Sequence, residues 1–244
     1  MKYKRILLKV SGGALAPDGK SGFDKKALEH ITDEIINAAN NGIEVAVLVG
    51  GGNIFRGRTA DEWKIERVEA DNIGMLATII NSLILRGALT YKDERDVRVM
   101  TSIPVTSVAE PYIRLRAIKH LEKGSIVIFG GGLGQPLVTT DYPSVQRAIE
   151  IRADVVLMAK EGTDGVYTAN PNVDPTAKRY KSIKCEDAIK QGLQVADQSA
   201  FILAKDYGMP MYVFDFNEKG AMLKVCQGEE IGTYVGNDCE TELY

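Results

Sequence analysis

Apolar residues follow two different spacings along the chain. Short, nearly continuous apolar runs predict buried strands, and stretches with apolar residues three or four positions apart predict amphipathic helices. The two patterns alternate almost throughout, which predicts a mostly parallel sheet with helices on both faces. The predicted strands are 5–10, 43–49, 97–101, 125–129, 154–159 and 211–216, and the predicted helices are 25–40, 63–91, 113–122, 142–152 and 198–207.

Polar residues mark the ends of several of these elements. Asp24, Asp141 and Asp197 each precede a predicted helix, where a carboxylate can accept hydrogen bonds from free backbone N–H groups as an N-cap. Residues 222–235 predict a hairpin around a glycine. The 63–91 helix is apolar on several sides, so we expect it to be either a core helix or part of a subunit interface.

Composition restricts the class of protein. The 244 residues are 45% hydrophobic and 26% charged, which is typical of one large soluble domain. A net charge of −3 argues against a non-specific nucleic-acid binder. No signal peptide and no apolar stretch of membrane-spanning length is predicted. Three widely spaced cysteines (Cys185, Cys226 and Cys239) match no disulfide or zinc pattern, so we expect a cytoplasmic protein. His30 and His120 are expected on helix surfaces.

Two glycine-rich stretches follow predicted strands. In residues 47–57, VLVGGGNIFRG, three glycines let the backbone approach a ligand closely, and Arg56 adds a guanidinium for phosphate. The alternative is a tight turn with a solvated arginine. In residues 129–141, Thr139 and Thr140 stand beside a predicted helix start, which is a natural anion site. Both stretches indicate phosphate binding at the carboxyl ends of strands.

Two common nucleotide-binding fingerprints do not fit. The dinucleotide pattern G-x-G-x-x-G would need glycine at Phe55, or at Gln135 or Leu137. Residues 14–21 fit only the loosest P-loop pattern, and the expected helix start at Asp24 lies too late for that motif. A nicotinamide dehydrogenase and a P-loop enzyme are therefore disfavoured.

Two charged residues near these stretches are candidates for chemistry. Lys9 ends the first strand, where its ammonium could face a transferring phosphoryl group or simply alternate outward on a strand edge. Asp71 could hydrogen-bond a sugar hydroxyl or belong to a solvated helix face. Helix capping alone would explain Asp141 and Asp197.

Six blocks in a fixed order carry a resemblance over nearly the whole chain. Together they resemble the UMP kinase branch of the amino-acid kinase family. The blocks are KVSGGAL at 9–15, VGGGNIFRG at 49–57, ADNIGMLAT at 70–78, GQPLVTTD at 134–141, DGVYTANP at 164–171 and LQVADQSAF at 193–201.

The resemblance implies a fold and an activity. It implies a three-layer α/β/α sandwich forming one amino-acid kinase domain over 1–244, with an acceptor lobe to about 158 and an ATP lobe from about 159. It also implies transfer of the γ-phosphoryl group of ATP, with Mg2+, to UMP, giving UDP for pyrimidine nucleotide biosynthesis. A homo-oligomer, in this family a hexamer, is expected, with neither nucleic acid nor membrane as partner.

The same resemblance assigns roles to individual positions. Lys9, Arg56, Asp141 and Asp197 would be catalytic, with Lys9 neutralising the phosphoryl group in flight, and Mg2+ would be carried by ATP near Asp141. The implied ATP-binding residues are Lys9, Val10, Ser11, Gly12, Gly52, Arg56, Glu161, Tyr167 and Asn170. The implied UMP-binding residues are Gly51, Asp71, Leu133, Gly134, Gln135, Pro136, Leu137, Val138, Thr139 and Thr140.

Several positions depart from the family pattern. Gly13 replaces a usual glutamate, and Glu161 and Asn170 replace an asparagine and an aspartate. Leu133 and Gln135 stand where threonine and asparagine commonly contact the base. Two alternatives therefore stay open: another small-molecule kinase of the same family, or a non-catalytic nucleotide-binding or storage protein on this scaffold.

Overall fold

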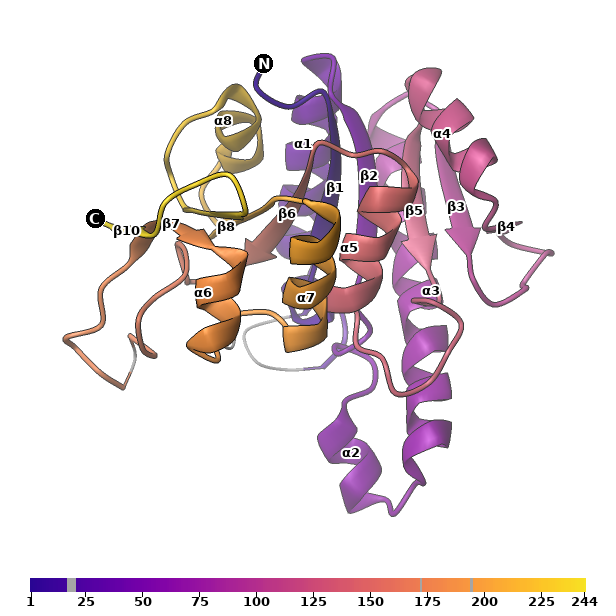
Figure 1. Cartoon of the computed structure of the whole chain (residues 1–244). Helices are drawn as coiled ribbons and strands as arrows, with labels where there is room; N and C mark the ends of the chain where they lie inside the picture. Colours follow the sequence, from indigo (N-terminus) through magenta and orange to yellow (C-terminus); the bar gives the residue numbers. More distant parts are fainter. Residues whose placement is uncertain (17–20, 172, 194) are drawn as a thin grey trace.

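In the computed structural model, residues 1–16, 21–171, 173–193 and 195–244 are described. One twisted sheet runs through the molecule with helices on both faces, and α2 and the start of α3 project beyond the end of the sheet (Figure 1). The helices are a 3-10 turn (Gly12–Leu15), α1 (Lys25–Asn40), α2 (Gly57–Glu62), α3 (Arg67–Lys92), α4 (Arg114–Glu122), α5 (Asp141–Glu150), α6 (Cys185–Lys190), α7 (Gln198–Tyr207) and α8 (Ala221–Gln227).

Within the described residues, ten strands form a single sheet in the order β10-β7-β9-β8-β6-β1-β2-β5-β3-β4. All neighbouring pairs are parallel except β8 with β9 and β7 with β10. The three-layer α/β/α prediction is confirmed. The strands are β1 (Arg5–Val10), β2 (Glu44–Val49), β3 (Val97–Thr101), β4 (Glu110–Pro111), β5 (Ile126–Gly130), β6 (Val155–Lys160), β7 (Tyr180–Lys184), β8 (Met211–Asp215), β9 (Thr233–Gly236) and β10 (Glu242–Leu243).

Strand alternation divides the core into two layers. Successive side chains of a strand point to opposite faces of the sheet. Ile6 and Leu8 of β1 accordingly pack in the layer of α1, α3 and α8, whereas Leu7 packs in the layer of α4, α5, α6 and α7. Lys9 has the same parity as Leu7, so β1 directs its side chain toward the layer that contains α5 and α7.

Most predicted elements lie within one or two residues of their expected bounds. The strand at 5–10 and the helices at 25–40 and 198–207 are found as predicted. Asp24 caps α1 by accepting a 2.8 Å hydrogen bond from the Ala27 N–H. Gly208 ends α7 in the left-handed conformation.

Other predicted elements need correction. The helix predicted at 63–91 is found as α3 but begins later, at Arg67, because Lys64 adopts a φ of +55° between α2 and α3. Thr140, not Asp141, is the N-cap of α5, and Asp141 is its first residue. The loose P-loop pattern at 14–21 lies partly outside the described residues, and β7 and α6 had no clear signal.

The predicted hairpin at 222–235 is wrong. Its first half is the helix α8, and β9 follows after a turn. The buried carboxylate of Glu34, on α1, accepts hydrogen bonds from the N–H groups of Gly220 (2.5 Å) and Met222 (3.1 Å). This remote cap satisfies the free N–H groups at the start of a short helix.

The expectation of no membrane-length apolar stretch is also corrected. By length and composition alone, α3 could cross a membrane. It instead lies along the sheet, in contact with β3, β5 and α1. The apolar side chains that face the sheet serve the core.

Candidate active site

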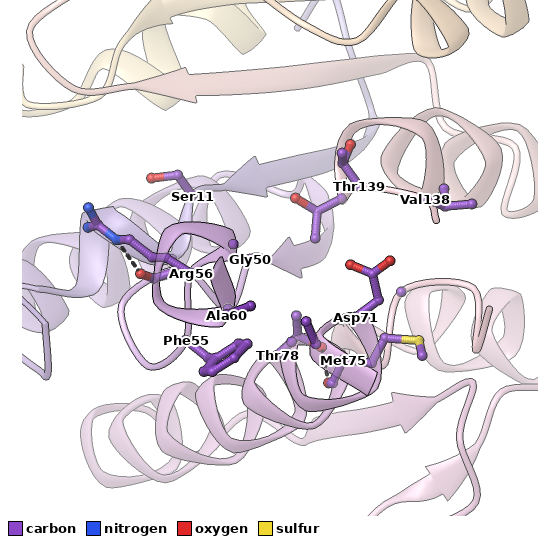
Figure 2. A pocket seen from close by; sticks show the side chains of 18 of the residues that line it. Ser11, Gly50, Phe55, Arg56, Ala60, Asp71, Met75, Thr78, Val138 and Thr139 are labelled. Atoms are coloured by element: carbon purple, nitrogen blue, oxygen red, sulfur yellow. Dashed lines mark hydrogen bonds between the residues drawn. The ribbon is translucent and has the colours of Figure 1, made fainter. Parts of the chain in front are cut away.

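A cavity of about 590 Å³ opens at the carboxyl ends of β1 and β2. Its walls come from the end of β1, the glycine-rich loop after β2, the first half of α3 and the loop between β5 and α5 (Figure 2). Open α/β sheets bind ligands at this edge, where strands give way to loops. The cavity therefore brings together most of the sequence-predicted site residues.

Glycine backbones pack against one another on one wall of this cavity. A Cβ on Gly12 would lie 2.4 Å from the backbone nitrogen of Gly52, and one on Gly50 would lie 2.8 Å from the nitrogen of Gly12. A Cβ on Gly51 would lie 2.7 Å from the carbonyl oxygen of Gly74 on α3. These glycines are required because two loops and a helix approach each other backbone to backbone.

A chain of hydrogen bonds connects β1 to the starts of α5 and α7. The Lys9 ammonium lies 2.6 Å from the Asp141 carboxylate, and both side chains are largely buried. The other oxygen of Asp141 accepts a 3.2 Å hydrogen bond from the Asp197 N–H. Thr139 donates its hydroxyl to the Asp197 carboxylate and accepts a hydrogen bond from the Asp141 N–H. The network fixes one cation at the edge of the cavity.

Asp71 extends into the cavity from α3 (Figure 2). Its carboxylate accepts a 2.8 Å hydrogen bond from the Leu137 N–H, and its two oxygens share the Nε–H of Arg67, at 3.0 and 3.1 Å. Asp71 therefore connects α3 to the loop between β5 and α5. Its oxygens are placed to accept hydrogen bonds from a ligand.

Arg56 lies on the far side of the glycine-rich loop from Asp71 (Figure 2). Its Nε donates a 2.6 Å hydrogen bond to the carbonyl oxygen of Gly52, and the residue is exposed. Among the residues that the structure describes, Arg56 forms no hydrogen bond or ion pair with Lys9 or Asp141, although all three belong to the predicted catalytic set. Arg56 lines the cavity as a solvent-facing cation.

A second cavity of about 510 Å³ lies beside β6 and is lined by residues between 160 and 171 on one side and by 191–193 and Val195 on the other. Tyr167 and Asn170, both predicted for ATP, line it, whereas Glu161 is not among its lining residues. Tyr167 is oriented by a 2.6 Å hydrogen bond from its hydroxyl to Asp164. The predicted donor residues thus divide between two cavities, with Ser11, Gly12, Gly52 and Arg56 in the first.

The predicted acceptor residues are also divided. Gly51, Asp71, Leu133, Gln135, Val138, Thr139 and Thr140 line the first cavity. Gly134, Pro136 and Leu137 are not among its lining residues, and Val10 is buried in β1. A smaller cavity continues from Leu133, Gln135 and Val138 toward Tyr142, Gln146 and Arg147.

Two residues that shape the site, Thr78 and Lys160, were not predicted from the sequence. Thr78 accepts a 2.7 Å hydrogen bond from the Gly131 N–H and so joins α3 to the end of β5. Lys160 ends β6, and its ammonium donates a 2.6 Å hydrogen bond to the Val195 carbonyl. Burial lowers the pKa of Lys160; the charge of Lys9 lowers it further, against the opposing charges of Asp141 and Asp197. The sequence pattern could have identified Lys160 as a candidate, because it ends a buried strand as Lys9 does.

Fold and site together define an open α/β protein with a cavity at the carboxyl edge of its sheet, lined by glycines and by Lys9 and Arg56. The family model for the amino acid kinase family matches residues 4–215. The chain belongs to the amino acid kinase family.

Relatives narrow this class further. The chain is 54% identical over 239 residues to a uridylate kinase of Frankia casuarinae, covering 98% of this chain and 92% of the relative. It is 56% identical over 234 residues to a uridylate kinase of Frankia alni, covering 96% and 91%. The crystal structure of UMP kinase from Bacillus anthracis matches with a TM-score of 0.97 at 56% identity, covering all of both chains. That of UMP kinase from Ureaplasma parvum matches with a TM-score of 0.90 at 33% identity, covering 97% of this chain and 100% of that one.

Proposed function

We propose that this protein is a UMP kinase, which transfers the γ-phosphoryl group of ATP to UMP and releases UDP and ADP in pyrimidine nucleotide biosynthesis. The observation that carries the proposal is the buried Lys9–Asp141 pair at the edge of a cavity that also contains Asp71. The relatives above, more than half identical in sequence, include two uridylate kinases.

Phosphoryl transfer to UMP needs positive charge and correct alignment of the substrates more than it needs a general base. The acceptor oxygen of UMP is already an anionic phosphate oxygen, so no proton must be removed from it. Phosphoryl transfer then depends on in-line positioning and on neutralising the oxygens of the transferred group. Lys9 supplies the positive charge, and Asp141 and Asp197 hold it in place. A preorganised cation of this kind acts mainly in the transition state.

Mg2+ fits this site as a partner of the donor phosphates. Among the residues that the structure describes, no group of three or more histidine, cysteine or acidic side chains could hold a metal. Magnesium commonly binds through substrate phosphates and one or two carboxylates while it keeps several waters. Asp141 is the carboxylate that we propose near the metal, and Mg2+ would help to neutralise the oxygens of the transferred phosphoryl group.

The nucleotide positions follow from the two cavities. Asp71 would accept hydrogen bonds from the UMP ribose, and Leu133 with Gln135 would lie against uracil. The donor phosphates would lie along Ser11, Gly12 and Gly52, with the donor nucleoside near Tyr167 and Asn170 in the second cavity. This division supports an acceptor lobe to about residue 158 and an ATP lobe beyond it.

Self-association is part of the proposal. The exposed side of α3 carries Val68, Leu76 and Ile80, each at least 36% exposed. Apolar residues on the outer face of a long helix are typical of a subunit interface. We propose that a second copy of the chain covers this face, within a hexamer. Three free cysteines, two of them buried, support a reducing, cytoplasmic location.

An assay of ADP release with ATP and Mg2+ tests the proposal. UMP, CMP, dUMP and no acceptor are compared, and selective turnover of UMP is expected. Because Leu133 cannot hydrogen-bond a base, a second candidate is another small-molecule kinase of the family. Faster turnover of a carboxylate, a carbamate or a different monophosphate would favour that candidate. ATP binding without any turnover would favour a non-catalytic binder.

A further inference from the structure

Lys160 is placed on the same side of the sheet as Lys9. β1 and β6 are parallel neighbours in which Lys9 lies opposite Met158. Residues paired in this way point to one face, and Lys160, two positions after Met158, points to that face as well. Two lysines from adjacent strands therefore face the helical layer that contains α5 and α7. Asp141 and Asp197 stand at the starts of these two helices.

The position of Lys160 is electrostatically unfavourable without a ligand. Burial lowers the pKa of Lys160, and the charge of Lys9 lowers it further. The carboxylates of Asp141 and Asp197 offset part of this effect. Asp141 already pairs with Lys9, however, and Asp197 already accepts the Thr139 hydroxyl. A group with more negative charge than these two carboxylates would stabilise both ammonium groups.

Lys160 also connects the two cavities electrostatically. It lines the second cavity together with Tyr167 and Val195, and it interacts electrostatically with Lys9, which lines the first. We expect a molecule that binds in both cavities to come close to both lysines. The Lys160 ammonium has three N–H donors, and the hydrogen bond to Val195 uses one of them.

We propose that Lys160 is a second phosphate-binding residue of the phosphoryl-transfer site, and that it contacts the β- or γ-phosphate of the nucleoside triphosphate. The proposal rests on the proposed kinase function. Lys9 and Lys160 would then hold the donor phosphates from two adjacent strands. Lys160 would also join the donor to the loop that leads to Asp197, through Val195.

The competing explanation is structural, since the hydrogen bond to Val195 could simply hold that loop. Equilibrium binding of adenosine, AMP, ADP and ATP, in the presence of Mg2+, distinguishes phosphate binding from this structural explanation. In Lys160→Met, adenosine should bind as in the wild type, whereas ATP should bind about 10-fold more weakly or worse, because a charged hydrogen bond is lost. The first ligand in the series adenosine, AMP, ADP and ATP that binds more weakly to Lys160→Met identifies the phosphate that Lys160 contacts.

Matched variants sharpen the comparison. Lys160→Arg keeps the charge and should recover part of the ATP affinity. Lys190→Met removes an exposed lysine on α6 that pairs with Glu186, and it should bind all four ligands normally. In turnover, Lys160→Met should raise KM for ATP and lower kcat, while KM for UMP should change little.

Thermal unfolding provides an independent readout. Because the pKa of Lys160 is lower in the folded state than in the unfolded chain, the protonated lysine disfavours folding at neutral pH. Lys160→Met removes this unfavourable charge but also the hydrogen bond to Val195, so we expect an unfolding temperature close to that of the wild type. Equal loss of affinity for all four ligands, or unchanged ATP binding, would overturn the proposal. Absence of UMP turnover in the wild type would count against the kinase function alone, because the binding series needs no acceptor.

Discussion

The side-chain amides of Asn53 and Asn81 exchange two hydrogen bonds in the interior of the protein, at 2.7 and 3.2 Å. Asn81 also donates to the Gly50 carbonyl at 2.6 Å, and Asn53 donates to the Gly22 carbonyl at 3.0 Å. Both side chains are at most 1% exposed. This pair fastens the glycine-rich loop to α3, so the loop's shape depends on a helix that begins after it.

Replacing Asn81 with alanine should therefore weaken both the fold and the site. The Asn53 amide and the Gly50 carbonyl would lose buried partners, which costs about 2 kcal/mol of the free energy of unfolding. We expect a lower midpoint in urea and higher KM values for both nucleotides. Asn41→Ala, which removes an exposed amide at the end of α1, is the control. A stable Asn81→Ala enzyme with normal KM values would contradict this role.

Replacement by alanine should impair stability and activity at Gly12 but not at the neighbouring Gly13. Gly12→Ala places a Cβ 2.4 Å from the Gly52 nitrogen, so the two loops must separate, at a cost of about 3 kcal/mol. Gly13→Ala meets only the Ser11 hydroxyl, at 3.5 Å, which is ordinary contact. Urea unfolding and ADP release should show a large defect for Gly12→Ala alone. Equal behaviour of the two variants would show that the loops can move apart at little cost.

Removing the charge of Asp141 should affect activity and stability differently. Asp141→Asn leaves the Lys9 ammonium buried without its partner, which costs about 3 kcal/mol. Turnover should fall about 100-fold as Lys9 loses its fixed position, as it should in Lys9→Ala. The double variant Lys9→Met, Asp141→Asn should regain stability but not turnover. Full activity in Asp141→Asn would show that the Asp141 carboxylate is not required for catalysis.

Asp71 should determine how well the enzyme separates ribose from deoxyribose. Asp71→Asn weakens the acceptor for a sugar hydroxyl, so KM for UMP should rise about 10-fold while KM for ATP stays constant. The preference for UMP over dUMP should narrow in the same variant. Asp33→Asn, on the exposed side of α1, should leave the KM for UMP and the preference for UMP over dUMP unchanged. An unaltered preference would place the ribose elsewhere.

Glu150 should contribute to stability in a pH-dependent way. Burial acts to raise its pKa, but hydrogen bonds from Gln146 and Tyr112 and the charge of Arg147 outweigh burial and hold the pKa below its ordinary value of 4.5. A lowered folded-state pKa gives stability that is present above pH 4.5 and is lost as the pH falls through the folded-state pKa. The urea midpoint of Glu150→Gln should therefore change less than that of the wild type on acidification below pH 4.5. Parallel profiles would exclude this contribution.

The sequence was sufficient where structure depends on nearby residues. The α1 helix and its Asp24 cap lie within one short stretch, and β1 is a short apolar run that ends at Lys9. Most of the cavity could also be predicted, since glycines and Asp71 occur in blocks that resemble a known family. The predicted roles of these residues stay predictions until the variants above are measured.

Remote contacts explain most of what the sequence did not predict. The α8 helix starts where Glu34, on a helix at the other end of the chain, satisfies its first N–H groups. Lys160 begins a stretch rich in glycine, asparagine and proline, which reads as a loop, and its relation to Lys9 depends on the pairing of β1 with β6. Short-range patterns contain no information about such pairings.

The position of β1 in the sheet has a consequence for synthesis on the ribosome. β1 pairs with β2, which follows after one helix, but also with β6, which lies in the second half of the chain. The half-sheet β1-β2-β5-β3 can assemble as the N-terminal half emerges, while one edge of β1 stays unpaired. Such an edge can pair with other nascent chains. Until β6 is made, the open edge of the strand that carries Lys9 is available for such pairing.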